Sequence, residues 1–461
     1  FNAYGTKATM GIDTSDGYKF KISRGPSTDA NPVLTLDPNY VPSATVVSTW
    51  TTRTSAADNS WTESCWSSER RLFVAVSTDG VGNRVMTSPD GITWTTRASA
   101  ADNYWRAVCW APELGIFCAV AANGTVNTQV MTSLDAITWT ARTAAANLAW
   151  QFLCWSPELR LFCAVSATGT GNRIMTSPDG ITWTSRTNPV DNNWISVGWS
   201  PDLRLFCAVA NTGTGNRIMT SPDGITWTIR TSPADNSWTS ICWSPELKIF
   251  CSVAYSGTGN RVMTSPDGIN WTIRTSAADN QWSSVCWSSE LKLFCTTAFS
   301  GTGNRIMTSP DGINWTTRTS PADNNWNSVC WSPELGIFMS ISDSGTGNRA
   351  MTSSSLYLNQ PAITVTGSLN TTNISNLLYV QNGNTSLGYN KDVAELYVYN
   401  SDLVPTTKSG VIIHQDATTA DSHLQFNAYG TKNTVGIDTS DSYKFKISRG
   451  PSTDEIGRAH V

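Results

Sequence analysis

The amino-acid sequence predicts an all-β repeat protein. Tryptophan recurs at a fixed spacing, strand-like runs alternate with turn sequences, and no stretch has the apolar period of a helix. All 21 tryptophans fall into three series of seven, spaced by 44 residues with a single step of 45 in each series. These series are Trp50, Trp94, Trp139, Trp183, Trp227, Trp271 and Trp315; Trp61, Trp105, Trp150, Trp194, Trp238, Trp282 and Trp326; and Trp66, Trp110, Trp155, Trp199, Trp243, Trp287 and Trp331. One structural unit is therefore repeated seven times.

Each repeat contains four strand-sized runs, as in residues 238–243, 249–254, 261–264 and 269–273. The sequences Ser-Pro-Glu-Leu, Gly-Thr-Gly-Asn, Ser-Pro-Asp-Gly and Ser-Ala-Ala-Asp-Asn separate the runs. Pro, Gly, Asn and Asp favour the backbone angles of tight reversals, so each separator is predicted to be a turn. Four antiparallel strands in about 44 residues match one blade of a β-propeller. The sequence therefore predicts a seven-bladed β-propeller.

The ends of the repeat array predict how the ring closes. Residues 44–52 match the fourth strand of a repeat, and residues 348–352 match the third. The last repeat thus lacks its own fourth strand. We expect the opening segment to supply that strand, because this pairing removes an exposed sheet edge.

A second, shorter repeat flanks the array, since residues 1–29 match residues 426–454 at 26 of 29 positions. The predicted organisation is a partial β-rich stalk module at 1–43, the propeller at 44–355, a β-rich linker or stalk at 356–425, and a truncated second copy of the module at 426–454. Residues 455–461 resemble the translation of a sequencing adapter and are left out of the fold prediction. This tail, and a first residue other than Met, predict a fragment of a longer chain.

Two sequence motifs resemble known families. The hairpin Ser-Pro-Asp-Gly-Ile-Thr-Trp at 88–94, 177–183 and 221–227 resembles the Asp-box of sialidase-like propellers, with one residue fewer between Asp and Gly. In that family the box is a structural turn, so this resemblance implies a fold rather than an activity. Residues 421–430 and 443–449 resemble the stalk of phage tail fibres and similar appendages. That resemblance implies an extracellular virion protein that forms a homotrimer through its stalk.

The composition argues against several partners. Charged residues make up 14% of the chain, against roughly 25% in globular proteins, and the net charge is −4. Such a charge gives no general attraction to nucleic acid or to an anionic membrane. No apolar run reaches the roughly 18 residues of a membrane span. We therefore expect no nucleic-acid partner and no membrane insertion.

Charge divides between two rims of the predicted disc, because successive strands alternate in direction. The turns after the first and third strands share the acidic rim, which carries Glu69, Glu113, Glu158, Asp202, Glu246, Glu290 and Glu334 with Asp90, Asp135, Asp179, Asp223, Asp267 and Asp311. The turn after the second strand and the connection between blades share the opposite rim, here called the arginine rim. It carries Arg84, Arg173, Arg217, Arg261, Arg305 and Arg349, the series beginning at Arg53, and Asp58, Asp102, Asp191, Asp235, Asp279 and Asp323.

Two interpretations of the arginine rim stay open. In the first, the six Arg of the turns bind an anionic or polyhydroxylated glycan together with Trp61, Trp105, Trp194, Trp238, Trp282 and Trp326. In the second, each Arg pairs with the Asp 18 residues further on, and Arg349 pairs with Asp58 across the closure. The one repeat without this Arg has Gln129, and Asn147 stands 18 residues later, so both charges are lost together. This joint loss favours structural pairing, although the two roles are compatible.

The remaining Trp and the Cys are predicted to pack. We expect the Trp66 and Trp94 series to be core, and the Trp61 series, which lies beside a turn, to be the more exposed one. The 11 cysteines follow the repeat, and a hairpin would place Cys109, Cys154, Cys242 and Cys286 opposite Cys118, Cys163, Cys251 and Cys295. Elsewhere Cys65 faces Val74, Cys207 faces Gly198 and Cys330 faces Met339. Such replacements predict buried, reduced thiols rather than disulfides or a metal site.

The pattern gives little support to catalysis. The three histidines, His414, His423 and His460, lie outside the repeats, and the prominent acids recur in every repeat, whereas an active site needs a unique constellation. No catalytic residue, cofactor or metal is predicted. The leading hypothesis is a phage tail-fibre or appendage protein whose propeller recognises a host-surface glycan or other receptor. The alternatives are a sialidase-like or other glycoside hydrolase, and a purely structural spacer.

Overall fold

The computed structural model describes residue 47 and residues 49–356 fully, and the backbone of seven strands within residues 2–36 and 422–448. Residues 455–461 and most of the predicted linker at 356–425 lie outside the described residues. Contacts divide the chain into two units, Val41–Gln360 and the combination of Phe1–Tyr40 with Pro361–Val461. Each unit is described by itself.

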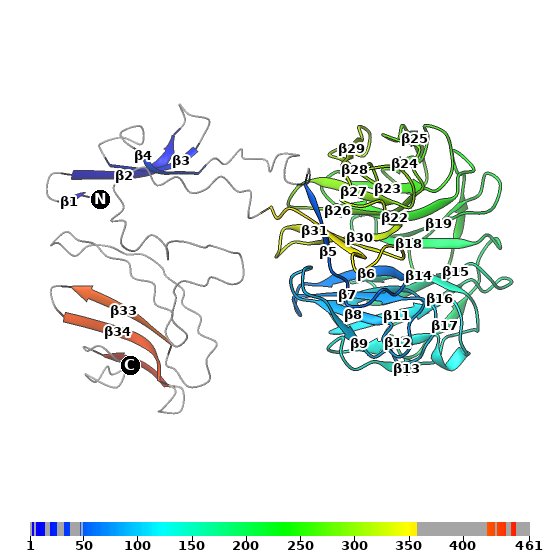
Figure 1. Ribbon diagram of the computed structural model, residues 1–461, viewed down its shortest axis with the longest axis horizontal. Helices are drawn as coiled ribbons and strands as arrows, with labels where there is room; N and C mark the ends of the chain where they lie inside the picture. Colours follow the sequence, from blue (N-terminus) through cyan, green and yellow to red (C-terminus); the bar gives the residue numbers. More distant parts are fainter. Residues whose placement is uncertain are drawn as a thin grey trace. The chain divides into compact units, whose positions relative to one another are not determined.

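The larger unit contains seven four-stranded antiparallel sheets, which are the blades of a propeller (Figure 1). Their strands are, in blade order, β6 (Trp61–Ser67), β7 (Leu72–Ser77), β8 (Val85–Ser88), β9 (Thr95–Arg97); β10 (Trp105–Ala111), β11 (Ile116–Ala121), β12 (Val130–Ser133), β13 (Thr140–Arg142); β14 (Trp150–Ser156), β15 (Leu161–Ser166), β16 (Ile174–Ser177), β17 (Thr184–Arg186); β18 (Trp194–Ser200), β19 (Leu205–Ala210), β20 (Ile218–Ser221), β21 (Thr228–Arg230); β22 (Trp238–Ser244), β23 (Ile249–Ala254), β24 (Val262–Ser265), β25 (Thr272–Arg274); β26 (Trp282–Ser288), β27 (Leu293–Ala298), β28 (Ile306–Ser309), β29 (Thr316–Arg318); and β30 (Trp326–Ser332), β31 (Ile337–Ser342), β32 (Ala350–Ser353), β5 (Trp50–Arg53). The one helical element among the described residues is the short 3-10 helix η1 (Val126–Thr128). The predicted seven-bladed, all-β propeller is confirmed.

The ring closes as the sequence predicts. Strand β5 pairs antiparallel with β32, with Trp50 opposite Ser353 and Arg53 opposite Ala350. In Figure 1 the blue strand β5 lies among the yellow strands of the last blade. The first strands of neighbouring blades contact one another around the whole ring, including β30 against β6. They are therefore the innermost strands and surround the ring axis.

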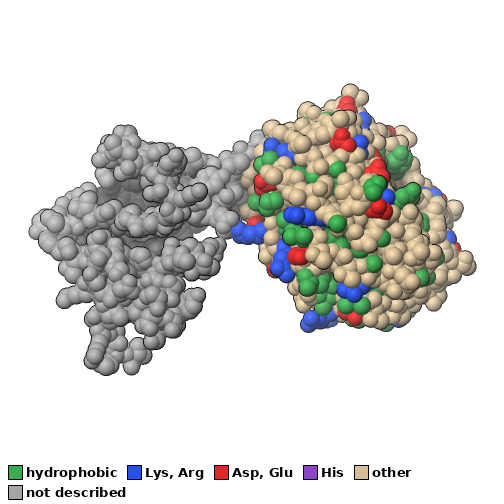
Figure 2. Space-filling view, turned by 60° about the horizontal axis from the view of Figure 1, so that its bottom comes forward, with side chains coloured by type: hydrophobic (Ala, Val, Ile, Leu, Met, Phe, Trp, Pro, Cys, Tyr) green, Lys and Arg blue, Asp and Glu red, His purple; other side chains and the backbone are tan. Residues whose placement is uncertain are grey.

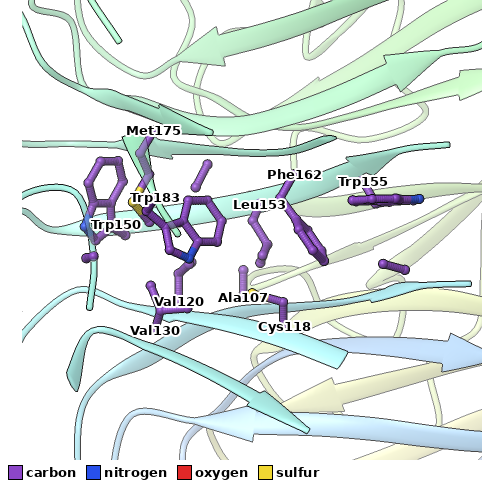
Figure 3. Packing of buried hydrophobic residues seen from close by; sticks show 13 residues of the cluster. Ala107, Cys118, Val120, Val130, Trp150, Leu153, Trp155, Phe162, Met175 and Trp183 are labelled. Carbon is purple, nitrogen blue, oxygen red and sulfur yellow. The ribbon is translucent and has the colours of Figure 1, made fainter. Parts of the chain in front are cut away.

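The hydrophobic core lies between adjacent blades. Figure 3 shows one such layer, in which Trp150, Leu153 and Phe162 of the third blade face Val120 and other apolar residues of the second. Equivalent layers occupy the other blade interfaces. Burying the large aromatic side chains removes a large apolar area from water in each blade. The core is thus a ring of similar layers rather than one central cluster.

The turn after the third strand depends on its Ser, Asp and Gly. In the first blade, the Oγ of Ser88 accepts the N–H of Gly91 at 2.8 Å, and Oδ1 of Asp90 accepts the N–H groups of Ile92 and Thr93 at 2.8 and 2.7 Å. Partial burial raises the pKa of Asp90, but the backbone hydrogen bonds outweigh it and lower the pKa below its usual value. Gly91 has φ +72°, which favours glycine. This carboxylate therefore has a structural role in the turn.

The predicted register of the cysteines is confirmed. Cys109, Cys154, Cys242 and Cys286 lie opposite Cys118, Cys163, Cys251 and Cys295 on paired strands, and the opposite residues at the other three sites are Val74, Gly198 and Met339. All 11 thiols are free. Burial raises the pKa of each thiol, including Cys109 and Cys118, so these groups stay protonated and pack as small apolar side chains.

The smaller unit contains two sheets. One comprises β1 (Asn2–Ala3), β2 (Thr6–Asp13), β3 (Lys19–Arg24) and β4 (Pro32–Leu36), and the other comprises β33 (Ser422–Ala428), β34 (Thr431–Asp438) and β35 (Lys444–Ser448). Ile12 lies opposite Phe20 in the first sheet, and Ile437 lies opposite Phe445 in the second. The two copies of the repeated sequence therefore form the same hairpin in the same register.

Candidate functional site

The six Arg of the turns are held by backbone carbonyls of the arginine rim. In the fourth blade, Nε of Arg217 donates to the carbonyl of Gly213 at 2.8 Å, and one terminal nitrogen donates to Asn211 and Asn236 at 2.8 and 2.9 Å. The bonds to the first two of these positions recur in all six blades that have the Arg. Only 11–15% of each side chain is exposed. The Arg side chains therefore stabilise the turns from within.

Each of these Arg side chains also pairs with the Asp that the sequence predicts. The distance from Nε to the carboxylate is 3.6 Å for Arg217 and Asp235, and 3.7 Å for Arg349 and Asp58 across the closure. All six predicted pairs are present. The Asp side chains are 38–43% exposed, and Oδ1 of Asp235 also accepts the N–H of Gly215 at 2.7 Å. Such pairs are worth about 0–1 kcal/mol each, but they fix the carboxylate at the surface.

In the second blade the uncharged Gln129 takes the place of the Arg. Nε2 of Gln129 donates to the carbonyl of Leu148 at 2.6 Å, which is the position that receives the third Arg hydrogen bond in other blades. The Oε1 atom of Gln129 is buried without a partner. An amide thus reproduces one of the three bonds to the backbone, and no Asp is needed opposite it.

The second Arg series is structural as well. Nε of Arg97 donates to Oγ1 of Thr87 at 3.0 Å, and the equivalent bond between the fourth and third strands occurs in all seven blades. These guanidinium groups are partly buried. The net positive charge of the arginine rim therefore comes from side chains that already have protein partners.

The expectation that the Trp61 series is the more exposed one is wrong. Trp61, Trp105, Trp150, Trp194, Trp238, Trp282 and Trp326 are all 0% exposed. Each ring lies between two blades beneath the connection, and Nε1 of Trp61 donates to the carbonyl of Ala57 at 3.0 Å. A position next to a turn in sequence does not place the side chain at the surface. In this structure none of these seven rings offers a face to a ligand.

The Trp66 series is instead the more accessible, with five of its seven members partly buried rather than buried. Each indole N–H donates to the acid of the preceding blade, as from Trp110 to Glu69 at 2.6 Å. The same bond joins all seven neighbouring pairs of blades, including Trp66 with Glu334. In Figure 3 the nitrogen of Trp155 points away from the core layer. The acids in the turns after the first strands thus connect the blades along the acidic rim.

The chain enters and leaves the propeller at the acidic rim. Thr49 and Ser354 flank the paired ends of β5 and β32, and the N–H of Ser354 donates to the carbonyl of Thr49 at 2.9 Å. The N–H of Leu356 donates to the carbonyl of Gly336, which lies in an acidic-rim turn, at 2.6 Å. The arginine rim is the rim without these connections.

The arginine rim exposes uncharged polar groups beside its fixed carboxylates. At the tip of the turn after the second strand, an exposed Thr follows the first Gly and precedes the Gly that binds the Asp, at Thr170, Thr214, Thr258, Thr302 and Thr346. The equivalent residue of the first blade is Val81, which is 90% exposed. Tyr104 and Tyr255 are 51% and 38% exposed on the same rim. Figure 2 shows that side chains other than hydrophobic or charged ones, with backbone, dominate the visible propeller surface.

Two charged residues near the ring axis break the repeat, and the sequence reasoning missed both. Oε1 of Glu63 accepts hydrogen bonds from the N–H of Ser64 at 3.0 Å and from the hydroxyl of Ser328 in the last blade. Burial raises the pKa of Glu63 to about 7, despite these bonds and the positive charge of Arg106. Burial lowers the pKa of Arg106, and the charges of Glu63 and Asp343 oppose that change. Aligning the seven copies position by position would have found this pair.

Within the described residues, no group of three or more His, Cys, Asp or Glu side chains is arranged to hold a metal ion. The same part of the chain contains no helical segment suited to crossing a bilayer.

Comparison with known proteins identifies the fold class. No protein-family model matches the chain, and no curated protein matches it. Many chains of solved structures do match, among them one from "Crystal Structure of Mitotic Checkpoint Complex", with 14% sequence identity and a TM-score of 0.50 over 67% of this chain and 91% of that one. At this identity the likeness is one of fold alone. Residues 50–353 thus form a seven-bladed β-propeller with four-stranded antiparallel blades.

Proposed function

We propose that this chain belongs to a phage tail fibre or similar extracellular appendage, and that the arginine rim of its propeller binds a glycan on the host surface. The point at which the chain enters and leaves the propeller supports this choice of rim. Thr49 and Ser354, at the described ends of the propeller, lie at the acidic rim, which is opposite the rim proposed to bind the receptor. Homotrimer formation through the flanking stalk would multiply the number of rims.

One observation carries the proposal. In five blades, an exposed Thr stands next to a Gly whose N–H holds a half-exposed Asp, as in Thr214, Gly215 and Asp235. The Arg side chain of the turn also contacts this carboxylate, so the carboxylate is positioned before a ligand binds. A carboxylate and a hydroxyl at a fixed spacing suit the paired hydroxyl groups of a sugar. Weak binding at each blade is sufficient, because repetition around the ring gives avidity.

The Arg residues take a different role from the one first considered for them. We assign them to holding the Asp and the turn rather than to direct contact with the glycan. Buried Trp rings of the Trp61 series are likewise assigned to packing. The glycan contacts proposed in their place are Thr170, Thr214, Thr258, Thr302 and Thr346 with Asp191, Asp235, Asp279, Asp323 and Asp58.

The test is binding of the 461-residue chain to a glycan array. Replacing the five Thr by Val should lower binding at least about tenfold, because each change removes one hydroxyl. Val81 already occupies this position in the first blade, so the variant should keep the thermal stability of the wild type. The matched control is Arg204→Gly on the acidic rim, where Gly115 and Gly336 are natural equivalents, and it should bind normally.

Three results would contradict the proposal. Unchanged binding by the five-Val protein would exclude this rim. Turnover of a bound glycan would favour the hydrolase considered from the sequence. Absence of both binding and turnover would leave the spacer.

A further inference from the structure

Two adjacent blades carry opposite charges near the axis where the other blades carry none. Glu63 occupies a position that holds Ala107, Phe152, Ser196, Ser240, Ser284 and Ser328 in the other copies. Arg106 occupies a position that holds Thr62, Gln151, Ile195, Thr239, Ser283 and Asn327. The repeat therefore folds without either charge, and a role in folding does not explain them.

Arg106 lacks the contact that four of its six equivalents make. Thr62, Thr239, Ser283 and Asn327 each donate to the carbonyl of the first Trp of the next blade, at 2.5–2.8 Å. Arg106 makes no such bond, and its Nε is buried without a partner. It forms no ion pair with any described residue. A buried guanidinium nitrogen without a hydrogen bond is costly, and hydrogen bonds within the protein do not account for Arg106.

Glu63 lies near Arg106 but does not neutralise it. Its Oε1 is held by Ser64 and Ser328, and no described residue donates to Oε2. Both charged residues stand in the first half of an innermost strand, and those strands begin at the arginine rim with Trp61 and Trp105. Both side chains are only partly buried. Both residues are therefore placed near the axis, toward its arginine-rim end.

We propose that Arg106 and Glu63 form a single binding site on the ring axis, at the arginine rim, for the carboxylate of an acidic sugar. A guanidinium group binds a carboxylate through paired, charge-assisted hydrogen bonds. Glu63 donates a hydrogen bond to the ligand when protonated, and it accepts one from a sugar hydroxyl when ionised. This inference rests on the proposed glycan-binding function, because it adds one acid-specific site to the repeated neutral sites of the same rim.

The surroundings of Glu63 determine how binding depends on pH. The titratable or charged groups near it are Cys65 on its own strand, Arg106 on β10, Cys286 on β26 and Cys330 on β30. Burial keeps the three thiols protonated, since it raises the pKa of each. Protonation of Glu63 removes one of the two negative charges, those of Glu63 and Asp343, that act on Arg106 and oppose a ligand carboxylate. Affinity for the carboxylate should therefore rise as the pH falls through neutrality.

The experiment is calorimetric titration of the 461-residue chain with sodium glucuronate and, separately, with glucose, at about pH 6 and about pH 8. Wild type should bind glucuronate in preference to glucose, and more tightly at the lower pH. Arg106→Gln, which copies Gln151, should lower glucuronate affinity about tenfold or more. Glu63→Ser, which copies Ser240, should remove the pH dependence. Arg204→Gly, the same loss of charge on the other rim, should change nothing.

Equal affinity for glucuronate and glucose, or an unaffected Arg106→Gln protein, would overturn the axial site. If the array still shows binding that the five-Val protein loses, only the axial site fails. If neither glucuronate nor any arrayed glycan binds, the proposed function fails with it.

Discussion

Replacing Glu63 by Gln should stabilise the propeller at alkaline pH and have little effect at acidic pH. The amide keeps an oxygen to accept from Ser64 and Ser328 but carries no charge. The pKa of Glu63 is raised from 4.5 to about 7 in the folded protein. The folded state therefore holds the proton more tightly than the unfolded state does, so the ionised form destabilises the fold.

The size and pH range of the effect follow from that pKa. A rise of about 2.5 pH units, from 4.5 to about 7, corresponds to about 3 kcal/mol as an upper limit, at 1.36 kcal/mol per unit. Below pH 4.5, Glu63 should not lower the free energy of unfolding of the wild-type protein. As the pH rises toward about 7, ionisation of Glu63 should lower that free energy progressively. Above that range the loss stays constant. The Gln variant should show no such decline.

The assay is urea unfolding of both proteins across this pH range, followed by tryptophan fluorescence. The difference in the free energy of unfolding should grow from near zero at the acidic end to its maximum on the alkaline side. Arg204→Gly serves as the control, because it also removes a charge but lies on the acidic rim. A difference that is constant with pH, or that is largest under acidic conditions, would refute the reasoning about burial of Glu63.

Three further predictions concern the parts that hold the ring together. Arg217→Ala should lower the free energy of unfolding by about 2 kcal/mol, since three backbone carbonyls lose a charged donor. Arg217→Gln should lower it less, because Gln129 occupies the equivalent position in the second blade. Chemical denaturation measures both changes. Trp110→Phe should cost about 1 kcal/mol by removing the hydrogen bond to Glu69, and the double change with Glu69→Gln should cost little more than the single one, as a double-mutant cycle would show. Deleting residues 1–53 should expose the edge of β32 and give a protein that aggregates or unfolds without cooperativity, which light scattering and thermal denaturation would detect; a monomeric, cooperative product would contradict the closure described here.

The features that could be predicted from the sequence are those that repeat. Seven copies of the same segment act as an internal comparison, so the number of blades, the strand that closes the ring and the register of Cys109 with Cys118 follow from position alone. The joint loss of charge at Gln129 and Asn147 likewise revealed the Arg–Asp pairs. Repetition makes such inferences possible because a contact must accommodate every copy.

The features that could not be predicted are the burial of side chains, contacts to the backbone, and residues that depart from the repeat. Trp61 lies next to a turn in sequence, but the connection passes over it and leaves the ring fully buried. The carbonyls that hold Arg217 belong to the backbone, whose path a residue pattern does not reveal. Glu63 and Arg106 escaped notice because the acids considered were those that recur. Comparing the seven copies for residues that differ, as well as for residues that recur, would have found both.

The pairing of β5 with β32 determines how the propeller would respond to tension applied to its two flanking segments. The N–H of Leu356 donates to the carbonyl of Gly336, and the N–H of Ser354 donates to the carbonyl of Thr49 at 2.9 Å, so force between the flanking segments would act on this end of the last blade first. Beyond that bond, Trp50 and Ser353 are the next pair in the antiparallel ladder. Pulling the two ends apart would unzip the ladder one pair at a time rather than shear all its bonds together. Stretching the flanking segments would therefore separate the closing strand β5 from β32 before it disrupts the other blades.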